Sequence, residues 1–252
     1  MGTWISHLRV AESLLTELPG LDEAAFTIGN LAPDSGIPNA DWSAFDPPKE
    51  VTHFLRPGED EGRCADLQFF RQYLEPLSPN DDRARYSFVL GYFFHLLCDN
   101  LWAKLIVSTS KRAYAKLFTE KKEAIWTVKR DWYDLDHRYV RCHPEGLFWR
   151  VLISTPNPPM YLPFISEAGL YHSLDYIRNF YSEEKERDLD RTYPYLNETT
   201  MTRFVTDSVS TLLKIHSNLQ KMNIPANTQT ALSLLTPKEI RPYEPPLGDI
   251  TW

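Results

Sequence analysis

Apolar residues recur at intervals of three and four along most of the chain, a spacing that places them on one face of an α-helix. The first predicted helix covers residues 3–18 and is followed by Pro19-Gly20, a pair that terminates helices. Its apolar positions are Trp4, Leu8, Ala11, Leu15 and Leu18. Further helices are predicted at residues 21–29, 62–77, 80–107, 113–141, 165–182 and 197–221. Strand-like alternation never extends beyond a few residues, so the sequence predicts an all-α fold.

The predicted helix at residues 80–107 is apolar on nearly every side, which is typical of a central, buried helix. Its apolar positions are Tyr86, Phe88, Val89, Leu90, Tyr92, Phe93, Phe94, Leu96, Leu97, Leu101, Leu105 and Ile106. The exception is a narrow stripe at intervals of four, formed by Ser87, Gly91, His95 and Asp99. Polar residues interrupt the only apolar stretch long enough to cross a bilayer, so no transmembrane segment is expected.

Two proline-rich segments indicate how the chain is divided into a domain and a tail. Residues 30–60 lack periodicity, and a loop of that length inside a compact domain is more often functional than idle. The end of the chain is again rich in proline. We therefore expect one helical domain at residues 1–225 and a tail at 226–252 that packs on the domain or trails from it.

Charge and cysteine content narrow the class of protein. The net charge of −7 over 252 residues argues against stable nucleic-acid binding, although it allows an enzyme that cuts nucleic acids. The three cysteines include no CxxC pair, so neither a disulfide framework nor a thiolate zinc site is indicated. The first residues do not form a secretory signal. We therefore expect a cytoplasmic protein, and the oligomeric state stays open.

The polar stripe suggests a metal site. A buried imidazole and a buried carboxylate each cost several kcal/mol unless paired. A divalent cation would satisfy both His95 and Asp99, and a hydrogen bond between them inside the core is the alternative. Three more residues of ligand type precede them: His7, Asp34 and His53. Each also has a simpler interpretation. His7 could be a half-buried helix residue, Asp34 could close an Asx-turn, and His53 could be a loop histidine packed on its neighbour.

Order and local context make these five residues resemble the zinc-dependent phospholipase C family. That family is similar to the zinc-dependent single-strand nucleases and to the amino-terminal catalytic domain of glycosylphosphatidylinositol-specific phospholipase D. The resemblance covers about residues 3–105. The segments that carry it are SHLRVA at 6–11, GNLAPD at 29–34, THF at 52–54 and LGYFFHLLCDNLW at 90–102.

The resemblance implies a catalytic centre with two or three zinc ions. One zinc would be held by Asp34, His53, His95 and Asp99. A second would be shared by Asp99 and His7. Asp34 would in addition orient the attacking water or accept its proton, which makes it the expected catalytic residue. Paired metals suit the hydrolysis of a phosphodiester such as a phospholipid head group or a nucleotide.

The chain departs from the family pattern at two places. The family completes its second zinc with the α-amino group of the mature first residue, and removal of Met1 would expose the amine of Gly2 five positions before His7. The family's third zinc needs downstream histidines, and the nearest candidates are Asp131, Asp134 and His137. A solvated acidic helix face explains these three equally well.

A basic stretch follows the predicted metal-bearing helix. Its members are Lys111, Arg112, Lys116, Lys121, Lys122, Lys129 and Arg130. It could attract an anionic head group or a nucleic-acid strand, or it could simply face solvent. The leading hypothesis is a phospholipase C-like phosphodiesterase. The alternatives are a zinc-dependent nuclease of the same superfamily and a metal-stabilised binding module without turnover.

Overall fold

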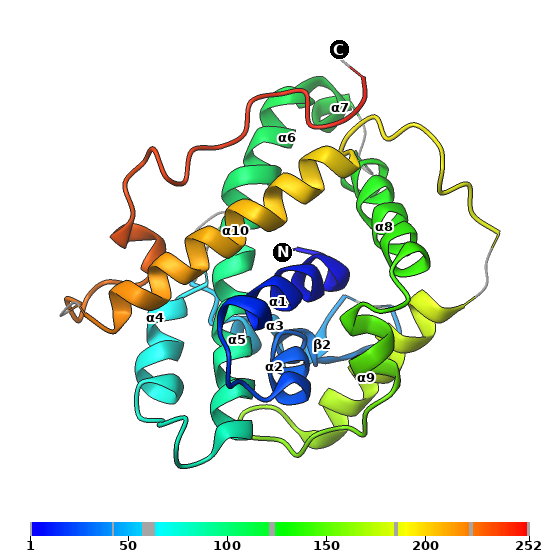
Figure 1. Cartoon of the computed structure of the whole chain (residues 1–252). Coiled ribbons are helices and arrows are strands. Elements are labelled where there is room, and N and C mark those ends of the chain that lie inside the picture. The colour runs from blue at the N-terminus through cyan, green and yellow to red at the C-terminus, as the bar shows by residue number, and fades with distance from the viewer. Residues whose placement is uncertain are drawn as a thin grey trace.

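The computed structural model describes residues 2–41, 43–56, 64–120, 124–183, 186–221 and 224–250, and these form a single helical domain (Figure 1). The all-α prediction is therefore confirmed. The strands found in the described residues are two short ones, β1 (Ile37–Pro38) and β2 (Phe45–Asp46), which pair antiparallel. Both strands lie inside residues 30–60, which the sequence pattern predicts to be a loop.

Ten α-helices occur in the described residues. They are α1 (Trp4–Glu17), α2 (Glu23–Gly29), α3 (Lys49–Thr52), α4 (Asp66–Phe69), α5 (Arg83–Trp102), α6 (Ser108–Ala113), α7 (Ala115–Glu120), α8 (Ala124–Cys142), α9 (Glu167–Ser182) and α10 (Glu198–Leu219). Short 3-10 helices are η1 (Ala32–Asp34) and η5 (Ala231–Leu234), and π-helical turns are η2 (Phe70–Leu74), η3 (Ala103–Val107) and η4 (Phe148–Ile153). The helix predicted at 113–141 is thus divided into α7 and α8, and residues 121–123 lie outside the description.

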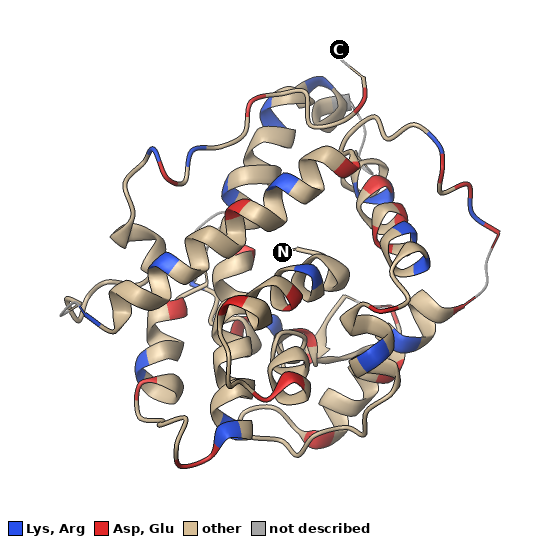
Figure 2. Cartoon of the chain, in the orientation of Figure 1, with Lys and Arg blue, Asp and Glu red and all other residues tan. Residues whose placement is uncertain are grey.

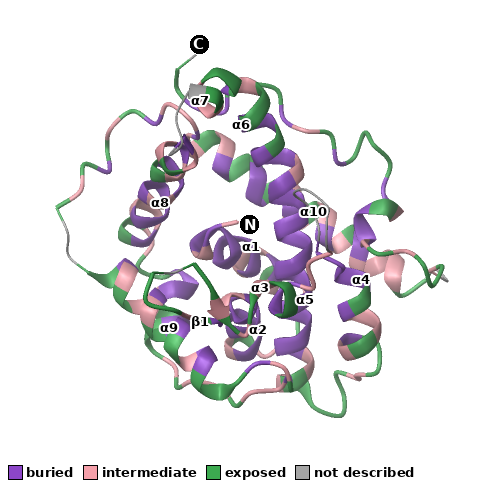
Figure 3. Ribbon diagram, turned by 180° about the vertical axis from the view of Figure 1, so that it is seen from behind, coloured by how far each residue is buried: buried purple, intermediate pink, exposed green. Residues whose placement is uncertain are grey.

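Helix α5 is the centre of the molecule. Every residue from Ser87 to Trp102 is buried, and the other helices surround it (Figure 3). It begins at the cap residue Asp82, whose side chain accepts a hydrogen bond from the backbone N–H of Arg85. The apolar pattern of residues 80–107 therefore predicted both the position and the burial of this helix.

Two glycines let α2 approach α5 backbone to backbone. A Cβ atom on Gly91 would lie 2.4 Å from the carbonyl oxygen of Phe26, and one on Gly29 would lie 2.1 Å from the carbonyl oxygen of Phe88. Ser87 extends the same contact, because its hydroxyl accepts a hydrogen bond from the backbone N–H of Asp22. Ser87 and Gly91 of the polar stripe therefore form a helix-packing surface. Only His95 and Asp99 of the stripe face the candidate site.

Helix α1 lies among α5, α8 and α10, with which it makes contact (Figure 1). Thr3 caps it by accepting a hydrogen bond from the N–H of Ser6, while the Ser6 hydroxyl accepts one from the N–H of Thr3. This cap starts the helix directly beside α5, so the first residues of the chain reach the centre of the domain.

The proline-rich tail packs on the helices in its described part. The backbone N–H of Ala231 donates to Asp66 at 2.7 Å, and the hydroxyl of Tyr243 donates to Asp207 at 2.8 Å. The carbonyl of Tyr243 also accepts a hydrogen bond from the Thr109 hydroxyl. Within the described residues, no helix combines the length and the apolar character needed to cross a membrane.

We expect Gly91→Ala to lower the free energy of unfolding by about 1–3 kcal/mol, because the added methyl group overlaps the Phe26 carbonyl. In an open helix the same change is stabilising by roughly 0.5–1 kcal/mol, so the sign alone is informative. Urea denaturation followed by circular dichroism measures it. The control is Arg85→Ala on the exposed start of α5, for which we expect a change of at most about 0.5 kcal/mol. Stabilisation by Gly91→Ala would contradict the close contact.

Candidate metal centre

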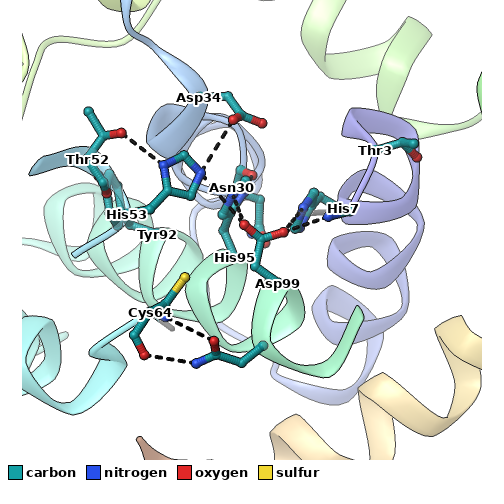
Figure 4. Close-up of polar contacts among 12 residues, drawn as sticks. Thr3, His7, Asn30, Asp34, Thr52, His53, Cys64, Tyr92, His95 and Asp99 are labelled. Carbon is teal, nitrogen blue, oxygen red and sulfur yellow. Dashed lines mark hydrogen bonds and ion pairs between the residues drawn. The ribbon is translucent and has the colours of Figure 1, made fainter. Parts of the chain in front are cut away.

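The structure brings together the five residues predicted as metal ligands, although they come from separate segments (Figure 4). His7 lies on α1, Asp34 ends η1, His53 follows α3, and His95 and Asp99 lie on α5. The three imidazoles are fully buried, and the side chain of Asp99 is only 3% exposed. Asp34 keeps 11% of its side chain exposed, so it alone among the five faces an opening.

Their donor atoms form two overlapping groups that could hold a metal ion. One group comprises His7, His95 and Asp99, and the other Asp34, His53 and His95. In each group the candidate ligand atoms lie within 4.8 Å of one another. These are the two groups of this kind found among the described residues, and they share His95. The arrangement therefore suits two neighbouring cations better than one.

The distances between the candidate ligand atoms suit coordination of a shared ion better than direct hydrogen bonds. Nε2 of His53 lies 3.4 Å from Oδ1 of Asp34 and 3.7 Å from Oδ2 of Asp99. Nε2 of His95 lies 3.6 Å from Oδ2 of Asp99, and Nε2 of His7 lies 3.4 Å from Oδ1. Hydrogen bonds to imidazole nitrogen are shorter. Two ligand atoms bound at about 2.1 Å in a tetrahedron lie roughly 3.4 Å apart, close to the separations seen here.

Several buried polar atoms at the centre lack a hydrogen-bond partner in the described part of the chain. They are Nε2 of His7, His53 and His95, and Oδ2 of Asp99. Leaving a polar atom buried and unpaired costs about 1–3 kcal/mol. These four atoms belong to the groups that could hold a metal ion.

The remaining nitrogen of two imidazoles is held in the orientation that metal ligation needs. Nδ1 of His95 lies 2.7 Å from the carbonyl oxygen of Asn30, and Nδ1 of His53 lies 2.9 Å from the Thr52 hydroxyl. A carbonyl only accepts hydrogen bonds, so Nδ1 of His95 carries the proton and Nε2 presents its lone pair. His7 differs, because neither of its ring nitrogens has a partner among the described residues.

Local contacts fix the loops that carry Asp34 and His53. The hydroxyl of Tyr92 on α5 donates to the carbonyl of Thr52, which ties the residue before His53 to the central helix. Pro33 lies within the 3-10 turn that ends at Asp34. The close contact of α2 with α5 brings the Asn30 carbonyl to His95. Each ligand is therefore positioned by backbone that is itself packed against α5.

The electrostatic environment shifts the pKa values of the individual candidate ligands in different directions. Burial, together with the charge of His95, lowers the pKa of His7 to about 4, so its ring is neutral at pH 7. Burial would raise the pKa of Asp34, but its contact with His53 holds it well below its usual range. Burial opposes protonation of His95 as well, yet the Asp99 carboxylate raises its pKa. Asp99 thus attracts positive charge to the centre, which a cation would supply.

The nitrogen of Gly2 also lies at this centre. Its N–H donates to Oδ1 of Asp99 at 2.7 Å, and a Cβ atom at this position would lie 3.0 Å from Nε2 of His7. The predicted proximity of Gly2 to the second group is therefore present. Its neighbour Thr3 donates a hydrogen bond to Asp136 at 2.9 Å. The sequence reasoning missed Asp136, whose role is visible only where α8 meets the start of α1.

The three candidates for a third metal make other contacts in the structure. Asp131 accepts hydrogen bonds from the backbone N–H groups of Tyr195 and Leu196 and pairs with Arg191 at 2.8 Å. Asp134 pairs with the same guanidinium at 2.7 Å. His137 packs against the rings of Phe180 and Tyr181. These three residues join neither metal-type group, and their structural role explains the acidic face.

A cleft leads from Asp34 to the surface. A cavity of about 280 Å³ is lined by Gly2, Thr3, Asp34, Lys49 and Lys129, among others. An adjoining cavity of about 680 Å³ shares Asp34 and both lysines with the first cavity and has largely aromatic walls. Those walls are Trp4, Phe45, Trp126, Tyr133, Tyr176 and Phe180. The candidate centre is therefore accessible to a small molecule from one side.

The basic residues between Lys111 and Arg130 make different contacts in the structure. Lys129 faces the cleft, whereas Arg112 hydrogen-bonds the carbonyl of Tyr243 and Arg130 lies 3.7 Å from Asp134. Lys121 and Lys122 lie outside the described residues. Helix α8 carries both basic and acidic residues (Figure 2). Lys49, which the sequence reasoning missed, joins Lys129 in the cleft from α3.

We expect Asp131→Ala to lower the free energy of unfolding by about 2–3 kcal/mol without changing bound metal. The change leaves the N–H groups of Tyr195 and Leu196 without their acceptor and removes one of the two carboxylates that pair with Arg191. Thermal unfolding and elemental analysis of the same preparation test both parts. The exposed Asp188→Ala is the control. A lower metal content at unchanged stability would restore Asp131 as a ligand.

Comparisons of the chain with family models, with curated proteins and with solved structures give no match. Buried histidine and aspartate groups at the centre of this all-α domain could hold metal ions.

Proposed function

We propose that this protein is a zinc-dependent phosphodiester hydrolase of the phospholipase C type. The observation that supports this most strongly is the convergence of three unpartnered imidazole nitrogens on Asp99 inside the core. A purely structural His–Asp pair needs one imidazole and would satisfy it. The five converging residues are also those that resemble the ligands of the phospholipase C family.

The ligand set favours zinc among the common divalent cations. Imidazole nitrogen with carboxylate oxygen in a four-coordinate arrangement is typical of zinc, whereas magnesium and calcium take mostly oxygen ligands. Asp34, His53, His95 and Asp99 would hold the first ion. His7 and the other oxygen of Asp99 would hold the second. The proposal includes two ions, since the ligands expected for a third are engaged elsewhere.

A further nitrogen could complete the second group. Two protein side chains leave a zinc ion under-coordinated, and the nitrogen of Gly2 already lies 2.7 Å from the shared Asp99 carboxylate. In a chain that begins at Gly2 this nitrogen would be a free amine and would offer a lone pair to the ion. A Cβ atom at this position would lie 3.0 Å from Nε2 of His7, a tight contact that glycine avoids.

Bound zinc would lower the pKa of a coordinated water and neutralise charge that develops on the phosphate. The residues of the chain would hold the zinc ions and orient the attacking water. Asp34 is the one ligand that is partly exposed and lines the cleft, so it can orient the attacking water and accept its proton. Asp99 and the three buried histidines hold the reactive centre in a space where bulk water has little access.

His95→Ala and Asp99→Ala are each expected to lose at least one equivalent of zinc per chain and to abolish hydrolysis of bis(p-nitrophenyl) phosphate. Both residues are central to the proposed ligand set, and the metal offsets the cost of burying them. Elemental analysis and a chromogenic assay are made on the same folded protein. The control is His143→Ala, which lies beyond the end of α8 and outside both groups. Full zinc content in either variant would contradict the proposal.

Asp34→Asn is expected to keep most of the bound zinc while it lowers kcat by roughly a hundred- to ten-thousand-fold. The amide oxygen can still serve as a ligand, but the amide cannot accept a proton from the attacking water. Zinc content and steady-state kinetics separate the two roles. Turnover within about threefold of the unchanged protein would reduce Asp34 to a structural ligand. Bound zinc without any hydrolysis in the unchanged protein would favour a non-catalytic binding module.

A further inference from the structure

Two lysines that form no ion pair with any described residue flank the opening beside Asp34. Lys49 begins α3 and Lys129 lies on α8, and both line the two cavities that adjoin Asp34. Neither forms an ion pair with a described residue within 4 Å. Each ammonium group instead lies over an aromatic ring, at 4.9 Å from Phe45 for Lys49 and 5.0 Å from Trp126 for Lys129. The rings hold the two charges in place without neutralising them.

The two lysines also influence each other and the candidate centre. Burial and then the positive charge of Lys49 lower the pKa of Lys129, while the charge of Asp34 acts in the opposite direction. Lys49 in turn helps to lower the pKa of Asp34. Two like charges held together at the edge of a cleft repel each other, so an anion placed between them would relieve this repulsion.

The cleft would carry more positive charge than a phosphodiester with one negative charge requires. Two divalent ions would bring four positive charges, and the carboxylates of Asp34 and Asp99 two negative ones, which leaves about +2. A phosphodiester carries a single negative charge. The cleft contains one other acid among its described lining residues, Asp41, which bonds to Ser43 at its exposed rim. The cleft is therefore more positive than the scissile phosphate alone requires.

We infer that Lys49 and Lys129 form a subsite for a second anionic group on the substrate, next to the phosphate that is cleaved. This inference rests on the proposed hydrolase function and deepens it by naming the class of substrate. The substrate is a phosphodiester whose retained arm ends in an anionic group, with a phosphate group as the best fit for two ammonium donors. An arm that ends in a quaternary ammonium group would be repelled by both lysines and disfavoured.

The test uses three p-nitrophenyl phosphodiesters that share a propyl arm ending in a phosphate, a hydroxyl or a trimethylammonium group. For the zinc-loaded protein we expect kcat/KM to be roughly tenfold or more higher for the phosphate-ended than for the hydroxyl-ended compound. The trimethylammonium compound should be the slowest. In the variant Lys49→Gln with Lys129→Gln, the ratio of phosphate-ended to hydroxyl-ended rates should fall to within about twofold of one.

Two further variants separate charge from structure. Lys129→Arg keeps the positive charge and should keep most of the preference for the phosphate-ended compound. Lys238→Gln removes an exposed lysine that lines neither cavity of the cleft, and the ratio should stay unchanged. Equal rates on the phosphate-ended and hydroxyl-ended compounds would overturn the inference, as would a preference that survives removal of both lysines.

A binding measurement distinguishes failure of this inference from failure of the proposed function. Calorimetry with propane-1,3-diyl bisphosphate needs no turnover and can be made on zinc-loaded and metal-free protein. Absence of hydrolysis with all three diesters would count against the hydrolase. On the same preparation, binding that weakens about tenfold in the double lysine variant would still support the anionic subsite. Equal affinity of the two proteins would overturn it.

Discussion

The burial of the Asp99 carboxylate on α5 is the constraint on which the rest of this structure depends. A charged group inside an apolar helix is stable only if it is compensated, and here the compensation comes from three imidazoles on three separate segments. These contacts are longer than hydrogen bonds and leave the ligand atoms of the rings unpartnered among the described residues. In the function we propose, a cation would complete this core, and metal binding would then be coupled to the stability of the fold.

Close packing of α2 on α5 supplies the precision that such a centre requires. Gly91 lets the backbone of α2 approach so closely that the carbonyl of Asn30 reaches Nδ1 of His95 at 2.7 Å. That contact decides which nitrogen of His95 faces Asp99. The same helix leads directly into η1, which ends at Asp34. One helix contact thus orients an imidazole and positions a carboxylate from the following turn.

The opposite wall of the site comes from α8 and the start of α1. Asp136 on α8 accepts hydrogen bonds from Thr3 and from Tyr181, and so holds the beginning of α1 beside Asp99. Lys129 lies two turns earlier on the same helix and faces the cleft. Helix α8 therefore has two functions, since it anchors the segment that carries Gly2 and contributes to the electrostatic character of the opening.

The sequence by itself determined the helices with strong periodicity, the burial of the central helix and the identity of the converging residues. Apolar spacing reports which side of a helix is buried, and His95 and Asp99 share a side because they are four residues apart. Only the tertiary structure decided what these residues and the others contact. Asp131 and Asp134 have the spacing of ligands, yet Arg191, far along the chain, neutralises them. Lys49 and Lys129 lie far apart in the sequence but line one cleft, because folding brings residues of α3 and α8 to the same cavity, and no local sequence pattern reports such a contact.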